Sequence, residues 1–293
     1  MLQRKFGGKL NRRPMSMQSR QRRRTDMTRY LAHSRTLSMP INDVSGATPA
    51  AIWVHILRLD VSPDEIHELF RVLSPAERQR AMRFRHLIDR RRFIAVRASL
   101  RQLVAAELDM DPREPAIEVG TYGKPRLTGE CALSGLQFNV SHSGDVAVIV
   151  LTHDRQVGVD VEVVRSLPDM DALVEQNFSQ REREEYAELP SDMHTVAFFN
   201  CWTRKEALIK AWGYGLSYPL DQFDVSLRPQ EPARIHRLAD VDGEHCGWEI
   251  HDFAPLPDTI AAIAVQSHSN TSPPQLEITG TRLSYPSPHE ISM

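Results

Sequence analysis

Cysteine is scarce in this chain, and its distribution excludes two classes of protein. Only three cysteines occur among 293 residues, Cys131, Cys201 and Cys246, and no two of them are close in the sequence. An odd and scattered set forms neither a disulfide framework nor a cysteine-based metal site. We therefore expect these residues to be small buried apolar side chains in a protein of the reducing cytoplasm.

Long apolar runs are also missing. No stretch approaches the roughly 20 apolar residues that a membrane-spanning helix needs. The positively charged N-terminus is not followed by the apolar segment of a secretory signal. Apolar residues nevertheless make up 41% of the chain, which is enough for a sizeable core in one large domain or two small ones. The sequence therefore predicts a globular protein with no membrane partner.

The formal net charge of −2 conceals a basic N-terminus. Residues 1–30 carry ten Lys or Arg against one acid, Asp26, so this segment is +9 and the rest of the chain is −11. An acidic body argues against nucleic-acid binding by the folded part. Residues 1–48 are basic, polar and aperiodic, and we predict that they are disordered.

Two interpretations of this basic extension are open. It is either an arm attracted to nucleic acid or membranes, or a dispensable extension that precedes a later start codon. Four methionines are candidates for that start: Met15, Met17, Met27 and Met39. We favour a dispensable extension, because chain termini are commonly disordered.

Strands are predicted wherever short apolar or alternating runs are bounded by turn residues. The expected strands are 51–57, 117–119, 136–140, 146–150, 156–163, 222–227, 247–251 and 260–265.

Helix starts are predicted from capping residues. Ser62-Pro63 begins one helix, and Ser74 and Ser179 each open a capping box with a glutamate three residues later. The helical region after Ser74 extends to about residue 108 and is expected to break near Asp89. A further helix is expected over 195–212, ended by glycines at 213 and 215.

The order of these elements predicts an α+β fold made of two comparable halves. We place the halves at residues 49–155 and 156–266, with a loose tail over 267–293 that is rich in Ser, Pro, Thr and Asn. No internal sequence repeat is evident.

Two segments combine to suggest a metal-assisted phosphate site. Asp160 and Glu162 are two residues apart on an expected strand, so both side chains point to the same side. Glu206 and Lys210 are four residues apart on an expected helix and share one face with Trp202. Three carboxylates repel one another unless a cation lies between them, and Mg²⁺ is a cation that prefers oxygen ligands. Alone, each fragment also fits an ordinary solvated surface.

Other residues near these segments carry cations or hydrogen-bond donors suited to phosphate. Lys205 either contacts phosphate or lies on a solvated helix face. Ser141 and His142 end a strand in a polar turn and are candidate donors to a phosphate or nucleotide. Lys124-Pro125 forms a rigid turn, which by itself is a common feature.

Arginine is concentrated in residues 77–101. This segment holds nine arginines against two acids, Glu77 and Asp89. Most of them fit a solvated helix face, because one helix cannot direct nine side chains at one ligand. We predict phosphate contact for Arg80, Arg92 and Arg97.

Together these segments resemble a known family. Gly158-Val-Asp-Val-Glu162 and Trp202-Thr-Arg-Lys-Glu-Ala-Leu-Ile-Lys210 look like the two signature motifs of 4′-phosphopantetheinyl transferases. Tyr122-Gly-Lys-Pro125 and Phe138-Asn-Val-Ser-His-Ser-Gly144 are similar to further segments of the surfactin-synthetase-activating (Sfp) type. The resemblance covers about residues 51–266 and leaves the N-terminal extension outside the pattern.

The resemblance implies a fold and a reaction. The fold would be a monomer of two α+β subdomains related by a pseudo-twofold axis, with the active site in the cleft between them. The enzyme would move the phosphopantetheine arm of coenzyme A to a serine of an apo acyl or peptidyl carrier protein. The second product would be adenosine 3′,5′-bisphosphate, and the carriers would belong to nonribosomal peptide, polyketide or siderophore synthesis.

The resemblance also implies residue roles. Asp160, Glu162 and Glu206 would bind magnesium, and Glu206 would accept the serine proton directly or through water. Lys210 would contact the reacting phosphate. The remaining expected coenzyme A contacts are Ser141 and His142 at the 3′-phosphate, Lys124 and Pro125 beside the adenine, and Arg80 and Arg92 at the nucleotide phosphates.

Two alternative functions use the same residues. A nucleotide or pyrophosphate hydrolase would employ the carboxylates without any carrier protein. A non-catalytic relative would only hold coenzyme A or a carrier domain. We favour the transferase, because a relative without activity need not keep all three acids.

Overall fold

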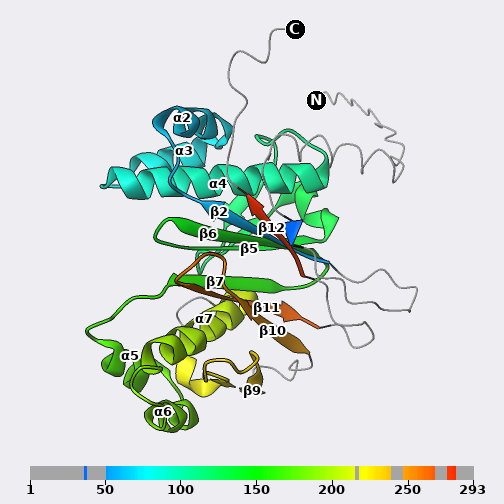
Figure 1. The fold of residues 1–293 in the computed structure, drawn as a ribbon. Helices are drawn as coiled ribbons and strands as arrows, with labels where there is room; N and C mark the ends of the chain where they lie inside the picture. The colour runs from blue at the N-terminus through cyan, green and yellow to red at the C-terminus, as the bar shows by residue number, and fades with distance from the viewer. Residues whose placement is uncertain (1–35, 38–50, 215–217, 239–246, 268–275, 282–293) are drawn as a thin grey trace, which may run out of the picture.

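The computed structural model describes residues 36–37, 51–214, 218–238, 247–267 and 276–281. These residues form an α+β structure in which two β-sheets lie face to face and helices cover both outer faces (Figure 1). Within this described part, no helix is both long enough and apolar enough to cross a membrane.

The first half of the chain forms a sheet with helices on its outer face. Its strands are β2 (Ile52–Arg58), β5 (Leu136–Ser143) and β6 (Val146–His153), and its helices are α2 (Pro63–Val72), α3 (Pro75–Met82) and α4 (Leu87–Leu108). β6 pairs antiparallel with both β2 and β5, which leaves β5 at an edge of the sheet. Between α4 and β5 lie a small hairpin, β3 (Ile117–Val119) and β4 (Pro125–Leu127), and the 3₁₀ helix η1 (Gly129–Ser134).

The second half repeats this connectivity. Its elements are β7 (Val157–Val163), α5 (Met170–Asn177), α6 (Gln180–Ala187), α7 (His194–Trp212), η3 (Leu220–Gln222), β8 (Asp224–Val225), β9 (Ile235–Arg237), β10 (Trp248–Phe253) and β11 (Thr259–Gln266). In both halves a strand is followed by helices, a small strand pair and a hairpin whose last strand pairs with the first. Sheet orders β2-β6-β5 and β7-β11-β10 are therefore equivalent.

Apolar side chains fill three layers between these elements. The layer between the two sheets consists mainly of valine and isoleucine from β2, β6, β7 and β11, including Val54, Val148, Val159 and Ile263. α4 covers the outer face of the first sheet, and α7 covers that of the second (Figure 1). β-Branched residues suit the inner layer, because they pack well on a pleated surface that is buried on both faces.

The two sheets meet along their edge strands, β5 and β7, through side chains. Three backbone N–H groups of β7 donate to side-chain oxygens of β5: Val159 to Asn139 at 3.0 Å, Val161 to Ser141 at 3.4 Å and Val163 to Ser143 at 3.2 Å. The partners advance in step along both strands, so β5 and β7 run parallel. Side chains thus satisfy edge N–H groups that a neighbouring backbone would otherwise bind.

Most predicted helix boundaries are confirmed. Ser62, Ser74 and Ser179 each accept a hydrogen bond from the N–H three residues on, and the glutamate at that position returns the bond. The break expected near Asp89 lies instead between Met82 and Leu87. Asp89 belongs to the first turn of α4, where a negative charge favours the helix N-terminus. Gly215 lies outside the described residues.

Three predictions made from the sequence need correction. The strand expected over 222–227 is reduced to Asp224–Val225 after a 3₁₀ turn. The tail expected to be loose contains β12 (Leu276–Thr281), which pairs in parallel with β2. The extension expected to be disordered contains β1 (Thr36–Leu37), which pairs with β12. Average composition conceals such short strands, because an added strand depends on an available sheet edge elsewhere in the chain.

α7 lies very close to β7, and residue 158 makes this approach possible. A Cβ atom added to Gly158 would lie 2.1 Å from the carbonyl oxygen of Ala207 and 2.3 Å from the nitrogen of Ala211. These are backbone atoms of α7 and cannot rotate away. The glycine thereby sets the distance between the strand and the helix that carry the predicted site residues.

We expect Gly158→Ala to lower the free energy of unfolding by about 1–3 kcal/mol, because an added methyl group overpacks this contact. Urea denaturation would measure the change. Gly120→Ala is the matched control, since its Cβ would meet no atom nearer than 3.3 Å. Equal stability of the two variants would show that the helix moves away without loss.

Candidate active site

β7 directs its two carboxylates toward α7. Val157, Val159 and Val161 lie in the apolar layer between the sheets. Because side chains alternate along a strand, Asp160 and Glu162 point to the opposite face, which α7 covers. The prediction that both acids share one side of a strand is therefore confirmed.

A lysine and two serines bind these carboxylates. Lys210 of α7 places its Nζ 2.5 Å from Asp160 Oδ1 and 3.0 Å from Ser141 Oγ. The Ser141 hydroxyl donates to Asp160 Oδ1 at 2.8 Å, and the Ser143 hydroxyl donates to Glu162 Oε2 at 2.6 Å. The structure thus brings predicted residues of β5, β7 and α7 together where the two halves meet.

Ser143 was missed by the sequence analysis as a site residue. Its signal was its spacing, because a residue two positions after Ser141 on one strand points in the same direction. The strand expected over 136–140 ends before Ser143, whereas β5 continues through it.

Burial and like charges perturb the acids. Burial, followed by the charge of Asp160, raises the pKa of Glu206 to about 7, and the Lys210 ammonium opposes the rise. Burial also raises the pKa of Glu162, against the hydrogen bond from Ser143. These groups are close enough to influence one another, and Asp160 and Glu206 are only 4% and 6% exposed.

The donor set fits a divalent cation that binds oxygen. Asp160 Oδ2 and Glu206 Oε1 are buried and have no hydrogen-bond partner within the described residues. Buried carboxylate oxygens without a partner are energetically unfavourable, and a bound cation is one way to satisfy them. In the same part of the chain, no three His, Cys, Asp or Glu side chains form a group that could hold a metal, so the predicted set of Asp160, Glu162 and Glu206 is not assembled as three ligands. Mg²⁺ is commonly held by one or two carboxylates together with waters and substrate phosphates.

His142 lies on the other side of β5 from Ser141. Its ring is solvent-accessible. Partial burial, then the positive charges of Lys210 and Arg92, lower the pKa of His142, whereas Asp89 and Asp160 oppose the change. Charged groups of both the carboxylate site and the start of α4 therefore act electrostatically on the ring. Because neighbouring strand residues point in opposite directions, Ser141 and His142 do not form one side-chain pair.

Lys124 connects the two halves. Its Nζ donates to the carbonyl oxygens of Val157 and Ala211, both at 3.1 Å. Burial lowers the pKa of this ammonium to about 8. Lys124 and Pro125 also line a cavity of about 410 Å³ between the β3–β4 hairpin and the C-terminal end of α7.

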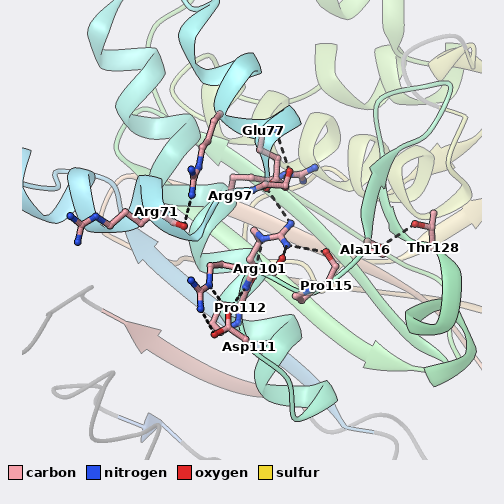
Figure 2. Close-up of polar contacts among 12 residues, drawn as sticks. Arg71, Glu77, Arg97, Arg101, Asp111, Pro112, Pro115, Ala116 and Thr128 are labelled. Atoms are coloured by element: carbon pink, nitrogen blue, oxygen red, sulfur yellow. Dashed lines mark hydrogen bonds and ion pairs between the residues drawn. The ribbon is translucent and has the colours of Figure 1, made fainter. Parts of the chain in front are cut away.

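The three arginines predicted to contact phosphate have different surroundings. Arg92 binds Asp145 in the β5–β6 turn at 2.9 Å, and Arg80 is exposed with its guanidinium over the Phe93 ring. Arg97 is instead half of a buried ion pair with Glu77 at 2.8 Å. Figure 2 shows the Glu77 carboxylate bound by Arg97 and by a second arginine of α4, Arg101. The prediction for Arg97 was wrong, because Glu77 is buried and needs cations.

Lys205 is not exposed, and the groups that its ammonium contacts include none of the three site carboxylates. It is fully buried, lies 2.7 Å from Glu182 Oε2, and donates to the carbonyl oxygens of Leu220 and Phe223. Glu182 in turn accepts the N–H of Val225 and closes the capping box of α6. Both interpretations of Lys205 are corrected: it is a structural cation that fixes α7 to α6 and the η3–β8 segment.

The two cysteines in the described part, Cys131 and Cys201, are free thiols. Burial raises the pKa of Cys201, which matches the expectation of an unreactive apolar residue. Cys246 lies outside the described residues.

Each half of the chain matches a known protein-family model. Residues 156–264 match the model of the 4′-phosphopantetheinyl transferase superfamily, and residues 60–154 match the model of the 4′-phosphopantetheinyl transferase N-terminal region. The 4′-phosphopantetheinyl transferase HetI of Nostoc is 35% identical over 214 residues, which are 72% of this chain and 87% of that protein. This chain belongs to the 4′-phosphopantetheinyl transferase family.

Other family members are similar across bacteria and animals. The 4′-phosphopantetheinyl transferase Sfp of Bacillus subtilis is 30% identical over 57% of this chain and 72% of its own length. The L-aminoadipate-semialdehyde dehydrogenase-phosphopantetheinyl transferase of Xenopus laevis is 32% identical over 62% of this chain and 65% of its own length. The solved structure of an ACPS–CoA complex from Chronobacterium ammoniagenes aligns with 40% of this chain and 98% of its own chain. The two are 18% identical, and the TM-score is 0.31.

Replacing Lys205 in this transferase tests its structural role. We expect Lys205→Met to destabilise the protein by about 3–5 kcal/mol, because it leaves Glu182 buried and unpaired. The double variant Glu182→Gln/Lys205→Met should lose less than the sum of the single changes. Thermal or urea unfolding would measure each variant, with the exposed Arg181→Met as control. Additive losses would contradict a direct pair.

Proposed function

We propose that this enzyme transfers the 4′-phosphopantetheine arm of coenzyme A to a serine of an apo acyl or peptidyl carrier protein. The other product is adenosine 3′,5′-bisphosphate. The observation that carries the proposal is the pair of buried, unpartnered oxygens of Asp160 and Glu206 beside Lys210, where the two halves meet. This arrangement supports cation-assisted phosphate chemistry in a chain of this family.

Asp160, Glu162 and Glu206 are the residues that we propose hold magnesium. When bound, the metal neutralises negative charge on the phosphate oxygens of the substrate. A cation here would oppose both the burial and, after it, the neighbouring negative charges that raise the pKa of Glu206 and Glu162.

The residues around the carboxylates account for the bond changes. The serine oxygen of the carrier forms a bond to the phosphorus of the phosphopantetheine arm, and the bond from that phosphorus to the leaving adenosine bisphosphate breaks. Glu206 receives the serine proton, directly or through one water. Lys210 stabilises the charge on the transferred phosphate, since its ammonium remains partly exposed beside Asp160.

Coenzyme A would extend from the carboxylates along the seam between the halves. We place the adenine in the cavity beside Lys124 and Pro125, and the phosphates near His142, Arg92 and Arg80. Gln156 lines this cavity and Asp160 follows four residues later, so the two regions are about 13 Å apart at strand spacing. Ser141 has two proposed roles. Its hydroxyl orients Asp160 and Lys210, and it contacts the 3′-phosphate of coenzyme A.

The proposal extends to biological context. The carriers are those of nonribosomal peptide, polyketide or siderophore synthesis. The enzyme acts as a monomer in the cytoplasm. The boundary between its two halves lies between residues 155 and 156.

Intact-protein mass spectrometry tests the reaction. An apo carrier domain incubated with this protein, coenzyme A and Mg²⁺ should gain the mass of one phosphopantetheine arm, and EDTA should prevent the gain. Release of adenosine bisphosphate with no change in any peptide, polyketide or fatty-acid carrier would favour a hydrolase. Binding of coenzyme A with neither product would favour a non-catalytic relative.

Two substitutions test the assigned roles. We expect Asp160→Ala to abolish transfer, because it removes a metal ligand and the partner of Lys210. Glu206→Gln should reduce kcat by about 10²-fold or more while the affinity for coenzyme A changes little. Steady-state kinetics and calorimetric titration would separate the two effects. Normal turnover with much weaker coenzyme A binding in Glu206→Gln would contradict its assignment.

A further inference from the structure

Four polar side chains of β5 point toward β7, and one of them makes no bond to that strand. Asn139, Ser141 and Ser143 each accept an N–H group of β7. Gln137 lies two residues before Asn139, so its side chain points the same way. Its amide has no hydrogen-bond partner within the described residues, and it lines the cavity of about 410 Å³. An amide both donates and accepts, so Gln137 is available to bind a ligand there.

The last residue of α7 supplies an aromatic wall of the same cavity. Trp212 is half-buried and lines the cavity, and Gly213 directly after it ends the helix with φ at +79°. The indole contacts the rings of Tyr218, Phe223 and Trp248 at interplanar angles of 65°, 70° and 83°. These contacts hold the indole in place. No ring in the described part of the chain stacks on it in parallel.

Lys124 ties the two walls of the cavity together. The β3–β4 hairpin contributes Tyr122 and Pro125 to one wall, and the end of α7 contributes Trp212 to the other. The Lys124 ammonium donates to the carbonyl oxygen of Ala211, the residue before Trp212, at 3.1 Å. This bond fixes the hairpin to the helix end that carries the indole, so the cavity has a defined width.

We infer that the Trp212 indole stacks on the adenine ring of coenzyme A and that the Gln137 amide binds the edge of that ring. This inference rests on the proposed function and names the residues that recognise the base. Adenine offers a flat π-face for stacking, and its edge carries an amino donor beside a nitrogen acceptor. An aromatic wall and an amide complement these two features.

The position of the cavity favours the base over the pantetheine arm. Glu206 and Trp212 are six residues apart on α7, a rise of about 9 Å along the helix axis. A ribose and a phosphate group link the base of coenzyme A to the reacting phosphorus, and they can span this rise. The arm contains amides but no aromatic ring, so it would leave the indole without a stacking partner.

Calorimetric titration of the full-length enzyme tests the role of Gln137. The ligands are adenosine 3′,5′-bisphosphate and purine riboside 3′,5′-bisphosphate, which lacks the 6-amino group. The wild-type enzyme should bind the adenine nucleotide about fivefold more tightly, because only this base donates to the amide. Gln137→Leu should bind the two nucleotides equally within about twofold. Gln180→Leu, which changes an exposed residue of α6, is the matched control and should keep the preference.

Two substitutions test the role of Trp212. Trp212→Leu should weaken binding of adenosine 3′,5′-bisphosphate about tenfold, whereas Trp212→Phe keeps a ring for stacking and should lose less than about threefold. The KM for the carrier should stay within about twofold in both variants. Tryptophan fluorescence adds a second readout. The nucleotide should quench the emission of the wild-type enzyme and of the control Trp53→Phe, and Trp212→Phe should lose most of this quenching.

The inference is overturned if the wild-type enzyme binds both nucleotides equally, or if Gln137→Leu keeps the wild-type preference. It is also overturned if Trp212→Leu weakens binding of 4′-phosphopantetheine instead of the nucleotide, which would place the arm in the cavity. Base-dependent binding with the expected variant effects, but without transfer to any carrier, would support the inference and count against the proposed function.

Discussion

The side-chain hydrogen bonds between β5 and β7 are the interaction on which the site depends. Asn139, Ser141 and Ser143 take the place of a neighbouring backbone and join the two sheets at their edges. A backbone carbonyl only accepts, whereas a serine hydroxyl also donates. Ser141 and Ser143 use that donor capacity on Asp160 and Glu162. One set of hydroxyls therefore joins the halves and orients the carboxylates, so the chemistry is located at the seam.

In both halves, a buried ion pair holds the long helix, α4 or α7, against a short helix. In each half, a short helix begins with a capping box whose glutamate is buried. Glu77 forms ion pairs with Arg97 and Arg101 of α4, and Glu182 forms an ion pair with Lys205 of α7. A buried carboxylate requires such cations, and each pair thereby sets the position of the helix that supplies them. α7 also carries Glu206 and Lys210, so the ion pair between Glu182 and Lys205 helps to position these site residues without contacting them.

The sequence was a good guide where local chemistry decides the outcome. The capping boxes at Ser74 and Ser179, the helix start at Ser62 and the shared face of Asp160 and Glu162 each depend on residues close together in the chain. Lys205 and Arg97 were misjudged because their partners, Glu182 and Glu77, lie about twenty residues away and are buried only after the helices pack. The role of Gly158 was similarly hidden, since a glycine in a strand does not reveal which backbone approaches it. The short strands at the chain ends were missed because pairing partners decide whether such segments become strands.

The parallel pairing of β12 with β2 has a practical consequence. The family match ends at residue 264, and a protein truncated near there would lack Leu276–Thr281. The outer edge of β2 would then present unpaired N–H and C=O groups along a strand that contains Ile52 and Val54. An open apolar edge of this kind is a template for pairing between copies. β12 thus covers an edge of β2 that would otherwise be open to pairing with another copy of the chain.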